Sequence, residues 1–285
     1  MQQLKWTVGD VRVTCIEETV IPYPWKALFP HFPETDLTPY LGWLRPTYFD
    51  NGSILMSIHS LLIESGKRRI LVDTCFGRRA AELPFKLPWC HPVPEELEAA
   101  GFPINSIDTV LCTHINSDHV GGTAILRDGR LVPAFPKATY LFTRPEMEYM
   151  EADPAHDTGK LMDSYIRPIV AAGVTQLVDM DCQLTPEVRL MPSPGHTPGH
   201  VGVRIISGGH EAVYTSDLMH TPMQVLMPDI AAHPDSNADQ AIASRRRILG
   251  ECADSGCLVI TSHFPRPTSG HVRRQEGGYR WEASK

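Results

Sequence analysis

The sequence predicts one large domain of the α+β class. Segments with the two-residue period of strands alternate along the chain with segments that carry helical spacing, and no internal repeat is visible. The chain has 285 residues, of which 42% are hydrophobic. That is enough to bury a substantial core, and it leaves little room for a second full domain.

The first hundred residues are expected to contribute three strands and a short helix. Residues 11–16 alternate apolar and polar side chains, which is the period of a half-buried strand. Residues 53–64 and 69–73 are two further strands, joined as a hairpin by Ser65-Gly66-Lys67. Residues 94–100 fit a helix, because proline starts this segment, acids fill its first turn and glycine follows its end.

A proline- and aromatic-rich segment extends from about residue 20 to residue 50. Prolines at positions 22, 24, 30, 33 and 39, among others in this segment, exclude a long helix or a central strand. So many aromatic side chains on an irregular segment must be buried against the body of the domain, a partner subunit in a homodimer, or a ligand. A second proline-rich stretch, residues 84–94, is expected to be a loop.

The rest of the chain continues this alternation. Ser236, with Asp239 three residues later, resembles a capping box that starts a helix. The basic run Arg245-Arg246-Arg247 in that helix is expected on its solvated face. We also expect strands at residues 109–112, 138–143, 176–178, 187–191, 201–206, 212–215 and 258–261, and helices at 120–126, 144–150 and 159–172, the last ended or kinked by Pro168.

The composition argues against nucleic-acid and membrane partners. The formal net charge is -7 and the pI about 6.0, whereas nucleic-acid-binding domains usually show a basic stripe and a pI above about 9. No run approaches the roughly 18 apolar residues of a membrane span. The seven cysteines form no Cys-x-x-Cys pair and the N-terminus shows no secretory signal, so we expect reduced thiols and a cytoplasmic protein.

A polar cluster directly after the strand at residues 109–112 has the composition of a metal site. His114, Asn116, Asp118 and His119 fall within six residues and are followed by two glycines. Imidazole and carboxylate are ligands that a zinc-like ion prefers, and a strand end can hold them at the roughly 2.0 to 2.2 Å that such bonds require. If the cluster stood alone, a solvated turn would be the competing interpretation.

The spacing of this cluster resembles the His-x-His-x-Asp-His signature of the metallo-β-lactamase superfamily, with Asn116 at the position of the second histidine. Four other segments are similar to the remaining motifs of that family and follow in the same order. They are Leu71-Val72-Asp73-Thr74, Pro194-Gly195-His196-Thr197-Pro198-Gly199-His200, Tyr214-Thr215-Ser216-Asp217 and Thr261-Ser262-His263-Phe264-Pro265. The resemblance implies that residues 1–285 form a single domain with a four-layer αβ/βα sandwich.

The resemblance also implies a ligand set for two metal ions. Asp73 would hold the metal loop through hydrogen bonds, and His200 would lie beside the ligands without binding an ion. The implied ligands are His114, Asn116 and His196 for the first ion and Asp118, His119 and His263 for the second, with Asp217 bridging the two.

Asn116 departs from the family pattern. An amide oxygen is neutral and is a poorer donor to zinc than imidazole. Our hypothesis is that the second site binds one ion tightly while the first is weak or empty. The alternative is that Asn116 binds through its Oδ1 and the centre holds two ions. Zinc is the expected ion, with iron or manganese as alternatives, because histidine and carboxylate ligands do not distinguish them.

The activity implied by the resemblance is hydrolysis of a small neutral ester, lactone or similar electrophile by a metal-bound hydroxide. Asp118 could orient the water or carry its proton, or it could be only a ligand, and Asp217 would bridge the metals. His220 could hydrogen-bond substrate, act as an acid, or be satisfied by backbone. The segment Ser216-Asp217-Leu218-Met219-His220 is similar to lactonase and organophosphate-hydrolase-like members. Phosphotriester hydrolysis, hydrolytic dehalogenation and iron-dependent oxidoreduction are the alternatives.

Overall fold

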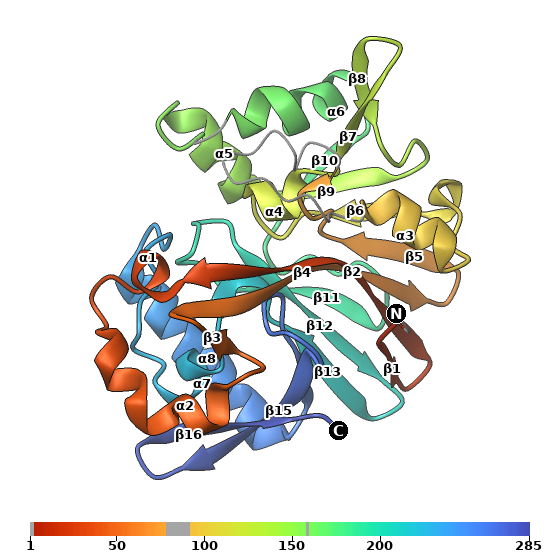
Figure 1. The fold of residues 1–285 in the computed structure, drawn as a ribbon. Coiled ribbons are helices and arrows are strands. Elements are labelled where there is room, and N and C mark those ends of the chain that lie inside the picture. The colour runs from red at the N-terminus through yellow and green to blue at the C-terminus, as the bar shows by residue number, and fades with distance from the viewer. Residues whose placement is uncertain (1–2, 78–91, 158–159) are drawn as a thin grey trace.

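The computed structural model describes residues 3–77, 92–157 and 160–285. Within them, two large β-sheets carry helices on their outer faces (Figure 1). This arrangement confirms the predicted α+β class and the four-layer sandwich. The loop predicted at residues 84–94 lies mostly outside the described residues.

The first sheet has the strand order β1-β2-β4-β5-β6-β9-β10, with β3 paired to β4. Strands β5, β6, β9 and β10 run parallel, and the others are antiparallel. The bounds are β1 Lys5–Val8, β2 Val11–Pro24, β3 Phe49–Asp50, β4 Ser53–Ser65, β5 Arg68–Val72, β6 Thr109–Leu111, β9 Thr139–Thr143 and β10 Thr175–Val178.

The second sheet follows the chain from β11 to β16, and only β13 and β14 are parallel neighbours. Apolar side chains of both sheets, among them Val13, Leu61 and Val203, form the core between them. The bounds are β11 Val188–Pro192, β12 Val201–Ser207, β13 His210–Tyr214, β14 Leu258–Ile260, β15 Ser269–Gln275 and β16 Gly278–Ala283.

Helices cover the outer face of each sheet and form a second apolar cluster with it. In Figure 1, α3, α5 and α6 lie beyond the first sheet, and α7 and α8 lie with the second. No helix in the described ranges has both the length and the apolar character needed to cross a membrane. The bounds are α1 Trp25–Leu28, η1 Glu34–Tyr40, α2 Leu41–Leu44, α3 Val93–Ala99, η3 Ile104–Ser106, α4 Ser117–Val120, α5 Arg144–Ala152, η4 Met162–Ile166, α6 Arg167–Ala171, η5 Ser216–Leu218, α7 Met223–Leu226 and α8 Ala238–Ser255.

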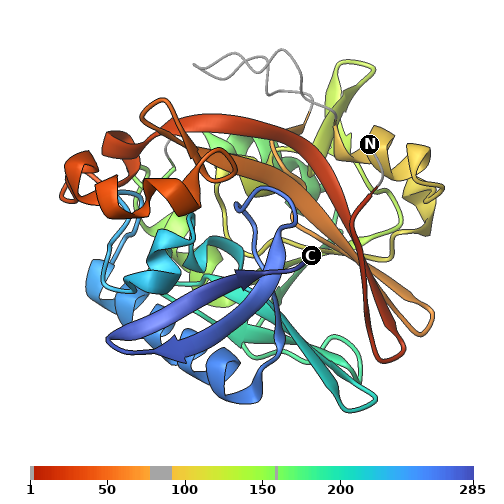
Figure 2. The same ribbon diagram turned by 60° about the horizontal axis from the view of Figure 1, so that its bottom comes forward.

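The proline-rich segment at 20–50 packs against the body of the domain. Strand β2 extends through Pro22 and Pro24, which is possible because this half of β2 pairs only with β4. Trp25 and Phe49 are fully buried, with ring centroids 6.2 Å apart. In Figure 2 this segment, in red and orange, lies on the same side of the molecule as the blue C-terminal hairpin. Tyr48 contacts Phe264, whose ring in turn contacts Trp281 of that hairpin.

The prediction of a helix at residues 120–126 is wrong. Helix α4 ends at Val120, and residues 124–133 form the hairpin of β7 (Ala124–Arg127) and β8 (Arg130–Pro133). Asp128 and Gly129 both have positive φ, 49° and 75°, as a two-residue turn of this kind requires. The Asp-Gly pair was the sequence signal for this hairpin.

Three details of the predicted helices also need correction. The N-cap of α8 is Asn237, whose side chain accepts from the Gln240 N–H, while the Ser236 hydroxyl donates to the Gly195 carbonyl. Pro168 does not end its helix, because it lies in the first turn of α6 directly after the π-helical turn η4. Arg245 is fully buried rather than solvated, and its guanidinium donates to the carbonyls of Leu218, Pro228 and Ile230.

Candidate metal centre

The predicted ligands lie in loops that follow the ends of strands. His114, Asp118 and His119 come after β6, on the loop that leads into α4 and within that helix. His196 follows β11, Asp217 follows β13 and His263 follows β14. Because β13 and β14 are parallel neighbours, their carboxyl ends place Asp217 and His263 side by side. The structure therefore brings these six predicted ligands to one place.

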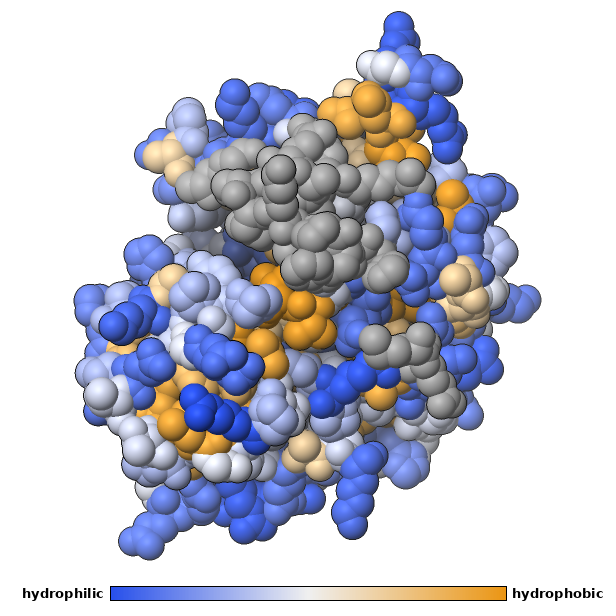
Figure 3. Space-filling view, in the orientation of Figure 1, coloured by the Kyte–Doolittle hydropathy of each residue, from blue (hydrophilic) through white to orange (hydrophobic). Residues whose placement is uncertain are grey.

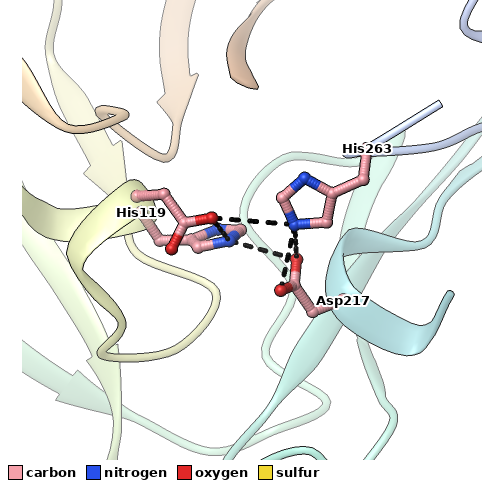
Figure 4. A group of neighbouring side chains, drawn as sticks. His119, Asp217 and His263 are labelled. Atoms are coloured by element: carbon pink, nitrogen blue, oxygen red, sulfur yellow. Dashed lines mark hydrogen bonds and ion pairs between the residues drawn. The ribbon is translucent and has the colours of Figure 1, made fainter. Parts of the chain in front are cut away.

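Four of these ligands form one group around Asp217 (Figure 4). The Asp217 Oδ1 atom lies 3.0 Å from His119 Nε2 and 3.1 Å from His263 Nε2. Asp118 Oδ2 lies 3.6 Å from His119 Nε2 and 3.7 Å from His263 Nε2. The ligand atoms of all four residues lie within 4.8 Å of one another, a spacing that a single divalent ion can span.

A second group shares Asp217 with the first. His114 Nε2 lies 3.8 Å and His196 Nε2 3.6 Å from Asp217 Oδ2, and these ligand atoms also lie within 4.8 Å of one another. The Asn116 amide reaches this group, because its Nδ2 lies 2.9 Å from His196 Nε2. Asn116 therefore lies beside the ligand group that contains His114 and His196.

The donor set fits a divalent metal ion. The Nε2 atom of His114 is buried and has no hydrogen-bond partner in the described part of the chain. A buried polar atom left without a partner costs about 1 to 3 kcal/mol, so an unpaired nitrogen facing a carboxylate needs a compensating ligand. Nitrogen and carboxylate oxygen donors in such a cluster suit zinc, iron or manganese.

The partners of the Nδ1 atoms turn the opposite nitrogens toward the centre. His119 Nδ1 lies 2.9 Å from Asp73 Oδ2, and His263 Nδ1 lies 3.1 Å from the Ser57 carbonyl. His196 Nδ1 lies 3.1 Å from Asp235 Oδ1. Each Nδ1 therefore carries the proton and donates it, which leaves the Nε2 lone pair free for an ion.

Burial and charge shift the protonation of the central groups. Burial opposes ionisation of Asp217, but His119, His263 and His114 around it outweigh this effect and hold its pKa well below the usual value. Burial lowers the pKa of His114 well below its usual value, with a further contribution from His119. The centre therefore holds an ionised carboxylate beside a neutral imidazole, which are the forms that bind metals.

Asp73 has the positioning role expected for it. Its Oδ1 accepts the Thr113 backbone N–H at 2.8 Å, and its Oδ2 holds His119. Asp73 has a φ of 61°, in the left-handed region that costs a non-glycine residue energy. In this conformation the Asp73 carboxylate contacts Thr113 and His119, which follow β6.

Glu146 is a buried carboxylate that the sequence did not single out. It lies in the first turn of α5, where Oε1 accepts the Ile115 N–H at 2.8 Å. Its Oε2 accepts the Thr197 hydroxyl at 2.6 Å and the Gly199 N–H at 3.1 Å. Gly199 is required here because a Cβ would lie 2.3 Å from the Glu146 nitrogen. Glu146 thus joins the loop that carries His114 to the loop that carries His196.

His200 and His220 differ in their surroundings. His200 Nε2 accepts the Asp217 backbone N–H at 3.0 Å, so His200 positions Asp217. The His220 side chain is buried, its Nδ1 has no hydrogen-bond partner in the described residues, and its Nε2 lies 3.3 Å from Asp217 Oδ2. The interpretation that backbone groups satisfy the His220 ring is therefore wrong.

Asp235 is a second positioning residue that had no sequence signal. Its side chain is completely buried, its Oδ1 faces His196 Nδ1, and its Oδ2 accepts the Ala232 N–H at 3.0 Å. Replacing Asp235 with Asn removes the charge that fixes the His196 tautomer. We expect metal affinity at the group containing His196 to fall about 10- to 100-fold, as is usual when such a partner is lost.

A competition titration of the Asp235→Asn protein with a chromophoric chelator measures this effect. Asp229→Asn is the matched control, because Asp229 is exposed and forms an ion pair with Arg246 at the surface. Unchanged affinity in Asp235→Asn would show that His196 needs no such partner.

A cavity of about 630 Å³ opens above the centre. Its floor includes Asn116, Asp118, Asp217, His220 and His263. No lysine or arginine lines it among the residues that the structure describes. Its walls carry both apolar and polar side chains. The polar ones include His156, Thr197, His233 and Ser236, and the apolar ones are Ile21, Tyr23, Leu28, Met56, Phe76, Ile115, Tyr149, Met150 and Leu161. In the space-filling view, apolar side chains are also visible near the middle of the molecule (Figure 3).

Comparison with known proteins gives a consistent result. Residues 54–251 match the metallo-beta-lactamase superfamily. A probable metallo-hydrolase of Mycobacterium bovis is 24% identical over 182 residues, which are 59% of this chain and only 58% of the relative's length.

Two solved structures share the fold. They are AidC, a dizinc quorum-quenching lactonase in complex with a product, and the hydrolase AbOPH of the beta lactamase superfamily. Each is 23% identical, with a TM-score of 0.84, and each alignment covers 99% of this chain and 97% of the other. At this identity the similarity shows a common fold and no more.

Proposed function

The chain belongs to the metallo-β-lactamase superfamily, and from that premise we propose that it is a metal-dependent hydrolase of small, neutral esters or lactones. The observation that carries the proposal is the buried histidine and aspartate cluster at the floor of a cavity whose walls include a set of apolar side chains. A cavity with no lysine or arginine among its described lining residues favours an uncharged substrate over an anionic one.

The residues divide into binding and orienting groups. The best-supported holders of an ion are Asp118, His119, Asp217 and His263, and zinc is the ion we propose. A divalent ion held there supplies a Lewis acid and a water molecule with a lowered pKa. The Asp118 side chain is 18% exposed, whereas that of Asp217 is 4% exposed. Asp118 is thus the carboxylate that faces the cavity, and we assign it to orienting water or accepting its proton.

The apolar walls support a substrate with an acyl or alkyl chain. Each methylene group that becomes buried contributes about 0.8 kcal/mol, so extending the chain by one carbon is expected to raise kcat/KM by about fourfold until the cavity is filled. A series of lactones with side chains of increasing length, assayed with zinc-, manganese- and iron-loaded protein, measures this.

His119→Ala, which removes a proposed ligand, is the control against contaminating hydrolases. A flat chain-length profile would contradict the assignment of the apolar walls. Preferential turnover of uncharged phosphotriesters or of an activated aryl chloride would replace the lactone proposal with one of those two reactions. Iron in the purified protein with no hydrolysis of any substrate would instead support oxidoreductase chemistry.

A further inference from the structure

The ligand group of His114, His196 and Asp217 has one nitrogen ligand fewer than the family pattern if Asn116 does not bind the ion. Because His196 Nδ1 faces the Asp235 carboxylate, it carries its proton there and its Nε2 is an acceptor. The Asn116 atom that lies 2.9 Å from this nitrogen must then be the amide Nδ2, which donates to it. The amide oxygen is not the atom that approaches His196, so Asn116 competes with an ion for His196 in this conformation.

The His220 imidazole also reaches Asp217 Oδ2, the carboxylate oxygen that His114 and His196 face. His220 Nε2 lies 3.3 Å from Asp217 Oδ2, which is nearer than His196 Nε2 at 3.6 Å and His114 Nε2 at 3.8 Å. The His220 and His196 ring centroids are 5.4 Å apart. Three histidines from three loops thus converge on Asp217 Oδ2, while His263 Nε2 lies 3.1 Å from both oxygens of that carboxylate.

The backbone of His220 is held in place from below the cavity. Its N–H donates at 2.8 Å to Gln224 Oε1, and the completely buried Gln224 side chain donates in turn to the Ile230 carbonyl. The imidazole contacts Asp217 Oδ2 through its Nε2, whereas its buried Nδ1 has no partner in the described residues. A general acid would need a group that returns its proton, and the Nδ1 side of the ring offers none.

We propose that His220 supplies the third imidazole of a metal site formed with His114, His196 and the Oδ2 atom of Asp217, and thereby replaces the nitrogen ligand that Asn116 does not provide. The inference rests on the proposed function only in assuming that the centre binds divalent ions. Filling this site requires the hydrogen bond from Asn116 to His196 to break. In addition, the Nδ1 atom of His220 has no hydrogen-bond partner in the described residues to orient the ring. This site therefore binds an ion more weakly than the site of Asp118, His119, Asp217 and His263 does.

The test is a titration of the metal-free protein with zinc by calorimetry, together with elemental analysis. The wild type is expected to bind one ion tightly and a second ion weakly. In His220→Ala the second ion should bind at least about tenfold more weakly, since loss of a ligand costs no less than loss of a ligand's partner, while the tight site is unchanged. Retention of the tight site shows that the variant is folded.

Two further variants make the test specific. Asn116→His should tighten the second ion by about tenfold or more, and the double variant Asn116→His with His220→Ala should recover the binding that His220→Ala loses. His233→Ala is the matched control, because His233 lines the same cavity but is exposed, whereas His220 is buried beside Asp217.

Equal affinity for the second ion in wild type and His220→Ala would overturn the proposal, as would a wild type that binds a single ion at any zinc concentration. These measurements involve no substrate. Failure to hydrolyse lactones would therefore count against the proposed substrate and leave the assignment of His220 intact.

Discussion

Asp217→Ala is expected to abolish hydrolysis, with kcat/KM at least about a thousandfold lower, because several kcal/mol of transition-state stabilisation depend on the metal centre. Among the residues that the structure describes, Asp217 is the one carboxylate that belongs to both ligand groups: Oδ1 faces His119, and Oδ2 faces His114 and His196. Its removal also leaves closely spaced imidazoles without the charge that attracts a cation. Both metal sites should therefore weaken together.

Steady-state kinetics and metal content measured on the same preparation check this prediction. Asp254→Ala is a suitable control, since Asp254 is an exposed aspartate on α8 that pairs with Arg274. If Asp217→Ala kept two ions and its rate, Asp217 would not be the shared ligand. Loss of one ion alone would show that it belongs to a single site.

Glu146→Ala is expected to destabilise the protein by about 3 kcal/mol, because it leaves three donors without an acceptor at about 1 kcal/mol or more each. Those donors are the Ile115 N–H, the Thr197 hydroxyl and the Gly199 N–H. Burial raises the pKa of Glu146, and these three hydrogen bonds offset that cost of keeping a carboxylate in the interior. Metal affinity should fall as well, since the two ligand loops lose the contact that joins them.

Thermal and urea unfolding of Glu146→Ala measure the effect, which corresponds to a fall in Tm of roughly 10 °C for a chain of this size. Glu148→Ala, in an exposed position on the same helix, is the matched control. An unfolding free energy for Glu146→Ala within about 0.5 kcal/mol of this control would show that the loops are held together without Glu146.

The pattern of neighbouring residues in the sequence was sufficient to predict most strands and the types of metal ligand. The hairpin of β4 and β5 and the strand β6 follow from apolar periodicity and turn residues, which are properties of neighbours in sequence. The hairpin at residues 124–133 was also encoded locally, by Asp128-Gly129, but the helix prediction overrode that signal. Arg245 shows the limit of such reasoning, because three carbonyls and the buried Asp235 carboxylate, all distant from it in sequence, surround its charge inside the protein.

By itself, the sequence determined the α+β class, the order of the motifs and the set of histidines and aspartates able to bind metal. Only the tertiary structure decided which of them meet and what supports them. Asp235 lies 39 residues from His196, and Glu146 lies 31 residues from Ile115 and 51 from Thr197. Such contacts arise where strands of two sheets end together, and no periodicity along the chain records them. For the same reason, the part played by His220 depends on its 3.3 Å approach to Asp217, a distance that spacing in sequence does not predict.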